Sequence, residues 1–195
     1  MFLDVEISGA SGYNGCMEKR ANGPIGNDEG DAVDAILRQW RAERPDLDVS
    51  AMGIFGRLAR AARILDRSLT RTFETYGLHR GEFDVLATLR RAGAPYGLTP
   101  TGLCRSMMLS SAAMTNRIDR LEERGLVARA PDPDDRRGVR IRLTEAGWTL
   151  IEAAVAAHVA GEELLLGALS EAERRQLAGL LKSLLSSMET RETQR

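Results

Sequence analysis

Residues 109–143, LSSAAMTNRIDRLEERGLVARAPDPDDRRGVRIRL, decide the fold of this chain. The first half of the stretch carries apolar residues at the spacing of one helical face. They are Met114, Ile118 and Leu121. Ser110 or Ser111 can cap the start of the helix, and Gly125 lies where a helix end favours a positive φ. We therefore predict a helix that begins at the serines and ends before Gly125.

After Gly125 the apolar period changes. Residues 126–129 are typical of a short strand, residues 131–138 of a charged turn, and residues 139–143 of a second strand with alternating apolar and basic side chains. A helix fits the major groove of B-DNA, and an arginine-tipped hairpin can reach the neighbouring minor groove. This order of elements predicts a recognition helix followed by a β-wing.

A shorter helix precedes the recognition helix. Thr99 offers an N-cap, and Pro100 occupies the first position of a helix over residues 100–106. Residues 79–91 form a further predicted helix, and residues 95–98 form a turn that can include a short strand. Two helices joined by a tight turn, the second with an outward polar face, predict a helix-turn-helix.

Two helices are predicted upstream, over residues 31–44 and 50–76. The apolar face of the first carries Val33, Ile36, Leu37 and Trp40, and that of the second carries Ile54, Leu58, Ala61, Leu65, Leu69 and Phe73. A basic row on the second helix has the same spacing and comprises Arg57, Arg60, Arg63, Arg67 and Arg71. This row is either a solvated face or a surface that contacts phosphate or an acidic partner helix.

The C-terminal part of the chain is rich in leucine and alanine. Residues 144–169 predict one helix, and Ser170 with Glu173 forms a capping-box signal for the last helix. That helix carries Leu177, Leu180, Leu181, Leu184 and Leu185. A small winged domain cannot cover this much apolar surface, so we expect a two-fold homodimer. Such a dimer suits a pseudo-palindromic double-stranded DNA operator, because its recognition helices lie about one DNA turn apart.

The predicted fold class is mainly α with a small β-wing. A winged helix-turn-helix domain is joined to a helical dimerisation region formed by the N- and C-terminal helices. The expected segments are a disordered start over 1–30, N-terminal helices over 31–76, the DNA-binding domain over 77–143, dimerisation helices over 144–188 and a tail over 189–195. Met17 is an alternative start.

Composition argues against several classes of protein. The 195 residues are 43% apolar and 28% charged, with a net charge of only −1, so a DNA surface has to be a local basic patch. Cys16 and Cys104 suggest neither a disulfide framework nor a zinc site, and no nucleophile motif is present. We expect no enzyme activity, no metal and no cofactor. Without a signal peptide or a membrane-length apolar run, a cytoplasmic protein is expected.

Three motifs occur in a fixed order along the chain. They are RLEERGLV at residues 120–127, DPDDRR at residues 132–137 and LTEAG at residues 143–147. Together they resemble the MarR family of winged helix-turn-helix transcription regulators, and the resemblance extends over residues 50–188. It implies a dimeric DNA-binding regulator, most often a repressor.

The resemblance also implies which residues contact DNA. On the recognition helix, the side chains expected at the major groove or its phosphates are Ser110, Ser111, Thr115, Asn116 and Arg120. At the wing we expect Arg136 and Arg137, with Asp135 bracing the loop through a salt bridge. The family motif Asp-x-Arg favours Arg137 for the minor groove.

A closer resemblance is to the urate-responsive branch of this family, which includes the PecS-type regulators. That branch has an added N-terminal helix, and its ligand pocket uses one tryptophan, one aspartate and two arginines. The matching residues here are Trp40, Asp84, Arg117 and Arg129. The resemblance therefore implies release from DNA by a small anionic ligand, urate or a related purine.

The sequence around two of these residues favours a ligand. Arg117 lies beside the inward row of the recognition helix, and Asp84 lies inside an apolar run, so each needs a charged or hydrogen-bonded partner. Urate offers its charge to arginines, its N–H groups to Asp84 and its ring to Trp40. Alternatively, Trp40 anchors the core, and Arg117 and Asp84 pair with each other.

Other functions remain open at this point. The effector can instead be a phenolic compound, or an oxidant acting through Cys104, although the apolar neighbours of Cys104 favour a small buried side chain. The chain can also be a constitutive DNA-binding dimer, or a small-molecule-binding protein or enzyme on the same fold. The basic wing argues against the last of these.

Overall fold

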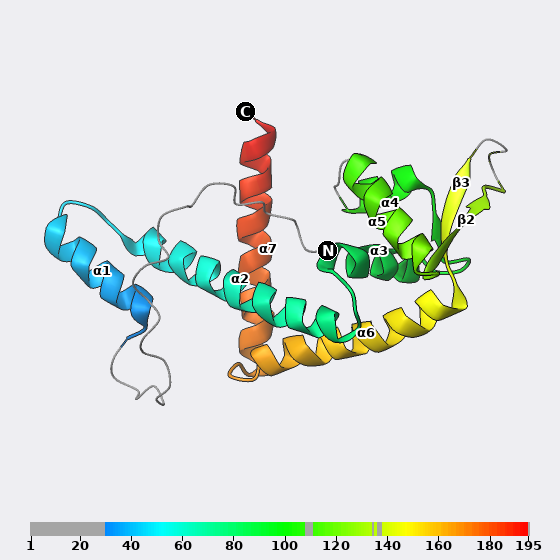
Figure 1. Cartoon of the computed structure of the whole chain (residues 1–195). Coiled ribbons are helices and arrows are strands. Elements are labelled where there is room, and N and C mark those ends of the chain that lie inside the picture. Colours follow the sequence, from blue (N-terminus) through cyan, green and yellow to red (C-terminus); the bar gives the residue numbers. More distant parts are fainter. Residues whose placement is uncertain (1–29, 108–110, 134, 136–137, 195) are drawn as a thin grey trace. The chain divides into compact units, whose positions relative to one another are not determined.

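The computed structural model describes residues 30–107, 111–133, 135 and 138–194 (Figure 1). This part of the chain is mainly helical with a small sheet, as predicted. Its elements are α1 (Ala32–Glu43), α2 (Ser50–Thr75), α3 (Arg80–Arg91), β1 (Gly97–Leu98), α4 (Pro100–Met107), α5 (Ser111–Glu123), β2 (Val127–Pro131), β3 (Val139–Leu143), α6 (Glu145–Leu165) and α7 (Glu171–Thr193). None of the described helices is long and apolar enough to span a membrane. The chain divides into two compact units, Met1–Asp66 and Arg67–Arg195, which are described separately.

In the first unit, α1 packs against the start of α2. Asp31 caps α1 by accepting hydrogen bonds from the backbone N–H groups of Val33 and Asp34, at 2.8 and 2.9 Å. Arg57 of α2 binds both acids of this turn, at 2.9 Å from Asp31 and 2.7 Å from Asp34. The small buried core under these contacts consists of Val33, Leu37 and Val49. The capping acids therefore also hold α1 to α2.

In the second unit, α3 is the central helix. Its side chains Val85, Leu86 and Leu89 are fully buried, because α3 contacts α4, α5, α6 and β3. The rings of Phe73 and Phe83 stack at 4.2 Å and extend this core toward α6. His158 of α6 lies 5.1 Å from Phe83, and burial lowers the pKa of its imidazole.

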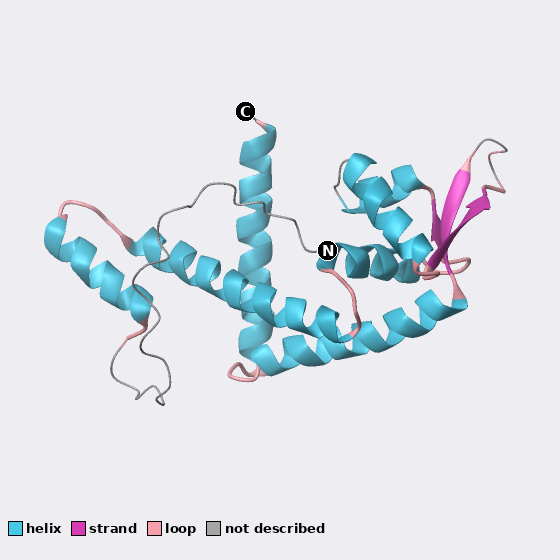
Figure 2. Cartoon of the chain, in the orientation of Figure 1, coloured by secondary structure: helices cyan, strands magenta, loops and turns pink. Residues whose placement is uncertain are grey.

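The wing is a three-stranded antiparallel sheet in the order β1-β3-β2, drawn in magenta in Figure 2. Leu98 of β1 pairs with Ile141 of β3, and β2 pairs with β3 from Val127↔Leu143 to Pro131↔Val139. Strand β2 reaches Pro131, beyond the predicted end at residue 129. Proline is tolerated there because β2 is an edge strand. The strand β3 has the predicted bounds, and its Ile141 is buried in the core.

Thr144 ties the base of the wing to α6. Its hydroxyl donates to the carbonyl of Gly125 at 2.7 Å and accepts from the N–H of Gly147 at 3.0 Å. Its own N–H donates to the carbonyl of Leu126 at 3.2 Å. Gly125, which has a φ of 67°, ends α5 at this same point. The end of α5 and the start of α6 are therefore joined across the hairpin.

The predicted end of α6 at residue 169 is wrong, because the helix ends at Leu165. Arg174 of α7 explains the earlier end. Its guanidinium donates to the carbonyls of Leu166 and Leu169, at 3.1 and 3.0 Å, and it also binds Glu163 at 2.5 Å. The guanidinium therefore binds carbonyls in the turn that follows the helix end, where helical partners run out. The predicted cap of α7 is confirmed: Ser170 and Glu173 form a capping box.

A side chain at position 147 is incompatible with this packing. A Cβ built on Gly147 would lie 1.9 Å from the carbonyl oxygen of Leu126, a backbone atom that cannot rotate away. Gly147→Ala should lower the free energy of unfolding by about 1–3 kcal/mol. Chemical denaturation measures this change. Gly161→Ala on the same helix is the control, since its Cβ would meet only Thr72 at 3.8 Å, and a helix-interior alanine should be neutral or slightly stabilising. Equal stability of the two variants would contradict this packing.

Candidate functional site

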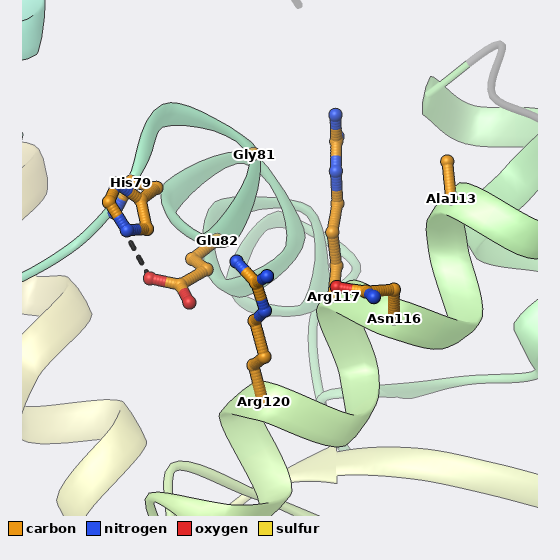
Figure 3. Close-up of a pocket in the computed structure, with 7 residues that line it drawn as sticks. All are labelled: His79, Gly81, Glu82, Ala113, Asn116, Arg117 and Arg120. Atoms are coloured by element: carbon orange, nitrogen blue, oxygen red, sulfur yellow. Dashed lines mark hydrogen bonds between the residues drawn. The ribbon is translucent and has the colours of Figure 1, made fainter.

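A cavity of about 400 Å³ lies between the start of α3 and the recognition helix α5 (Figure 3). Three of its lining residues come from the chain around the start of α3 and four from α5. They are His79, Gly81, Glu82, Ala113, Asn116, Arg117 and Arg120. A drug-sized ligand fits a space of this order.

Arg117 lies against α3 because position 81 has no side chain. A Cβ on Gly81 would lie 2.5 Å from both Cζ and Nε of Arg117. Figure 3 shows the extended Arg117 side chain rising from α5 along the cavity, beside the first turn of α3. The missing side chain at Gly81 therefore gives the guanidinium its position.

Glu82 is a buried carboxylate in the wall of this cavity, with only 4% of the residue exposed. Its Oε2 atom accepts two hydrogen bonds, one from the backbone N–H of His79 and one from Nη1 of Arg124, both at 3.0 Å. Arg124 follows the end of α5, so this carboxylate ties α3 to the recognition helix. Figure 3 shows the Arg120 side chain extending from α5 toward Glu82.

The charges around the cavity favour an anion. Two guanidinium groups, those of Arg117 and Arg120, outnumber the single carboxylate of Glu82. The first turn of α3 adds the partial positive charge of a helix N-terminus. The Glu82 carboxylate can in addition accept a hydrogen bond from a ligand. The cavity therefore suits a small anion that also carries a donor.

The structure brings only part of the predicted ligand set to this cavity. Arg117 lines it, whereas the described lining does not include Asp84, which is half-buried on α3. Trp40 lies on α1 in the other compact unit, where it is 42% exposed and outside the small core. Arg129 of β2 is exposed and forms ion pairs with Asp119, at 2.5 Å, and with Glu122. The hydrogen bond from Asp119 raises the pKa of Arg129, so this cation is already held by carboxylates.

The recognition helix has a buried side and an exposed side, as predicted. Met114, Ile118 and Leu121 are buried in the core. Thr115, Asn116 and Arg120, three of the predicted DNA contacts, are exposed. Asn116 and Arg120 also line the cavity. The predicted DNA surface and the cavity therefore share side chains of one helix.

The other predicted DNA contacts are only partly within the described residues. Ser110, Arg136 and Arg137 lie outside them, and the side chain of Ser111 is not described. Asp135 is exposed, and its carbonyl accepts from the N–H of Gly138 at 2.8 Å.

Sequence analysis missed the aspartate that braces the wing hairpin. Asp132 is 8% exposed and forms an ion pair with Arg140 of β3 at 2.9 Å. Its backbone N–H donates to the carbonyl of Gly138 at 3.0 Å. The available signal was its place directly after β2, two residues beyond Ala130, which pairs with Arg140 of β3.

No group of three or more histidine, cysteine, aspartate or glutamate residues that could hold a metal occurs in the described ranges. Cys104 of α4 is a half-buried free thiol.

Comparison with known proteins places this geometry in a family. The sequence model of the MarR family matches residues 76–138. The regulator PecS of Dickeya dadantii is 45% identical over 149 residues, which cover 76% of this chain and 90% of PecS. The chain belongs to the MarR family. It is therefore a DNA-binding transcription regulator that resembles PecS, and the family resemblance inferred from its motifs is confirmed.

Other MarR-family proteins agree with this assignment. The transcriptional repressor NicR of Pseudomonas putida is 32% identical, over 55% of this chain and 66% of NicR. The crystal structure of apo MarR from Escherichia coli has a TM-score of 0.56 and 30% identity, over 67% of this chain and 96% of MarR. A structure of Bordetella bronchiseptica BpsR, whose DNA binding is regulated by 6-hydroxynicotinic acid, has a TM-score of 0.58 and 28% identity, over 67% of this chain and 91% of BpsR.

The buried Glu82 carboxylate should contribute measurably to the stability of this MarR-family chain. Glu82→Gln removes the charge from hydrogen bonds to His79 and Arg124, and the free energy of unfolding should fall by about 1.5–3 kcal/mol. Glu123→Gln, at an exposed position near the end of α5, should change stability by less than about 0.5 kcal/mol. Urea denaturation compares the two variants. A Glu82→Gln variant as stable as the control would show that the carboxylate does not tie α3 to the recognition helix.

Proposed function

We propose that this chain is a homodimeric repressor that binds a pseudo-palindromic operator and is released by a small anionic, purine-like ligand such as urate. The carrying observation is the position of Arg117, which stands on the recognition helix yet lies over Gly81 in the cavity behind it. A ligand bound there contacts the same helix that presents Thr115 and Asn116 to DNA.

Ligand and DNA favour different positions of α5. A ligand bound between Arg117 and the start of α3 tilts the helix and changes the spacing of the two half-sites. Asn116 and Arg120 line the cavity and are also predicted DNA contacts, so an anion in the cavity competes with phosphate for them. To act as a switch, the ligand has to bind the DNA-incompetent state better, by about 1–3 kcal/mol per site.

The chemistry of the cavity supports a planar anion with hydrogen-bond donors. Arginines 117 and 120 can bind negative charge, and the carboxylate of Glu82 can accept from an N–H group. The regulation of BpsR by 6-hydroxynicotinic acid shows that a small heterocyclic acid can act on a protein of this fold. Urate and related purines have the same combination of charge, planarity and donors.

The roles of the other three ligand residues are part of the proposal. Asp84 would bind ligand N–H groups, and Trp40 would contact the ring. Arg129 would have to exchange Asp119 and Glu122 for the ligand.

Exposed apolar side chains support the homodimer. Along α6 and α7 the large exposed ones include Val159, Leu164, Leu177, Leu180, Leu181, Leu185 and Met188, and along α2 they include Ile54 and Phe55. Ile54, at 59% exposed, belongs to the predicted apolar stripe of α2, of which Leu69 and Phe73 are buried within the described chain. Exposed apolar side chains in this number mark a protein interface, and a second copy would cover them.

The dimer is tested by a charge placed in this surface. Leu180 of α7 is 62% exposed, and Leu180→Glu should convert the dimer to a monomer in sedimentation velocity and abolish tight operator binding. Lys182→Glu, at an exposed position on the same helix, should leave the dimer intact. A wild-type chain that sediments as a monomer would refute the homodimer.

The ligand is tested by a gel shift at fixed salt, with the DNA flanking the gene as the probe. Urate, xanthine and salicylate are titrated in turn, and urate should release the wild-type chain. Arg117→Ala should need about tenfold more urate or beyond, because it removes a charged hydrogen-bonding partner. Gly81→Ala should weaken the response in the same direction, since its Cβ displaces the guanidinium.

Arg91→Ala, an exposed change at the far end of α3, is the control and should respond like wild type. If none of the three compounds releases DNA, the purine proposal fails and a constitutive or otherwise regulated DNA-binding dimer is favoured. Release by urate that survives Arg117→Ala combined with Asp84→Ala would place the ligand elsewhere.

A further inference from the structure

Exposed arginines follow one side of α2. We refer to Arg60, Arg63, Arg67 and Arg71, all exposed, as the α2 arginine row. With 3.6 residues per turn, the four side chains leave the helix within about 80° of one another. From Arg60 to Arg71 the helix rises about 16 Å. The row is thus a narrow basic surface along one continuous helix.

The neighbouring Arg57, in contrast, has a structural role on this helix. It holds Asp31 at 2.9 Å and Asp34 at 2.7 Å, and so fixes α1. Among the described residues, no hydrogen bond or ion pair joins a member of the row to another side chain. Asp66, at the edge of the row, makes an interaction of its own. The row therefore has no structural role of the kind that Arg57 has.

The acidic residues at the α6–α7 corner are poor candidates for pairing with the row. Glu163 binds Arg174 at 2.5 Å, Glu171 binds Arg175 at 3.4 Å, and Glu162 lies 3.4 Å from His158. A second copy of the chain would bring these same paired carboxylates, together with scattered exposed acids such as Glu189 and Glu192. A row of four cations is matched better by a regular row of anions, such as the phosphates of DNA.

We infer that the α2 arginine row binds the phosphate backbone of DNA that flanks the operator. Each strand of B-DNA carries one phosphate per about 3.4 Å of axis, so a row of about 16 Å can follow several consecutive phosphates. The guanidinium fork suits phosphate oxygens. The net charge of the whole chain is only −1, so such contacts depend on local rows of this kind. The inference rests on DNA binding by this MarR-family chain and is independent of the ligand proposed above.

The test measures how DNA binding by the full chain depends on salt. Two duplexes are compared by fluorescence anisotropy: the shortest that retains wild-type binding in the gel shift, and the same duplex extended by about ten base pairs at each end. The row variant combines Arg60→Gln, Arg63→Gln, Arg67→Gln and Arg71→Gln. The control removes the same charge from exposed arginines elsewhere, with Arg38→Gln, Arg41→Gln, Arg91→Gln and Arg191→Gln. A third variant replaces the four row residues by lysine.

On the extended duplex, the row variant should reduce the slope of log K against log salt by up to about 3–4 per protomer, because each lost phosphate contact contributes about 0.9. The control variant should keep the wild-type slope, and the lysine variant should restore most of it. On the short duplex the row variant should bind like wild type.

Equal slopes for the row and control variants on the extended duplex would overturn the inference. An equal loss on both duplexes would overturn the flanking position. A row variant that sediments differently from wild type in the absence of DNA would assign the row to a protein interface instead. If the wild-type chain binds neither duplex, DNA binding itself fails, and the row loses its partner with it.

Discussion

The burial of α3 is the constraint on which the rest of the second unit depends. Val85, Leu86 and Leu89 are fully enclosed because α4, α5, α6 and β3 all contact this helix. A helix enclosed in this way fixes the positions of its neighbours, since a core packed at crystal density yields little to displacement. The start of α3 therefore supports the side of α5 that faces it. The cavity between them follows from the packing of the core.

Charged side chains and a glycine at the end of this apolar contact determine the charge and the space of the cavity. Glu82 leaves the core at the first turn of α3 and meets Arg124, while Gly81 leaves room for Arg117. One turn of helix thus provides a tie to α5 and a space for a cation. In our proposal a ligand uses this same turn, so the element that positions the recognition helix is also the one that senses the effector.

Helix starts were predictable from the sequence because their signals are local. Thr99 accepts from the N–H of Gly102, Thr144 from that of Gly147, and Ser170 forms the capping box, each within three residues. The alternation of apolar and basic side chains around Ile141 predicted β3 with its observed bounds. Arg117 was also predictable as a cavity residue, because a charged side chain beside an inward apolar row needs an unusual environment.

What the sequence could not show depends on contacts between distant residues. In the sequence, a glutamate near a helix start resembles a solvent-exposed acid of the first turn. No residue near Glu82 in the sequence indicates that it pairs with Arg124, 42 residues away. The ion pairs of Arg129 with Asp119 and Glu122 were hidden for the same reason. Apolar spacing on α2 predicted a buried face correctly for Leu69 and Phe73. It could not distinguish burial within one chain from the burial by a second copy that we propose for Ile54.

The junction at Thr144 makes the wing a separable module. The two ends of the hairpin meet where the hydroxyl of Thr144 donates to the carbonyl of Gly125, so the base of the hairpin is closed. A change in tip length or sequence alters how far the hairpin reaches without moving α5 or α6. If the wing contacts DNA as we propose, regulators built on this plan can diverge at the tip while keeping one core, and grafting a tip between relatives becomes a practical way to alter operator choice.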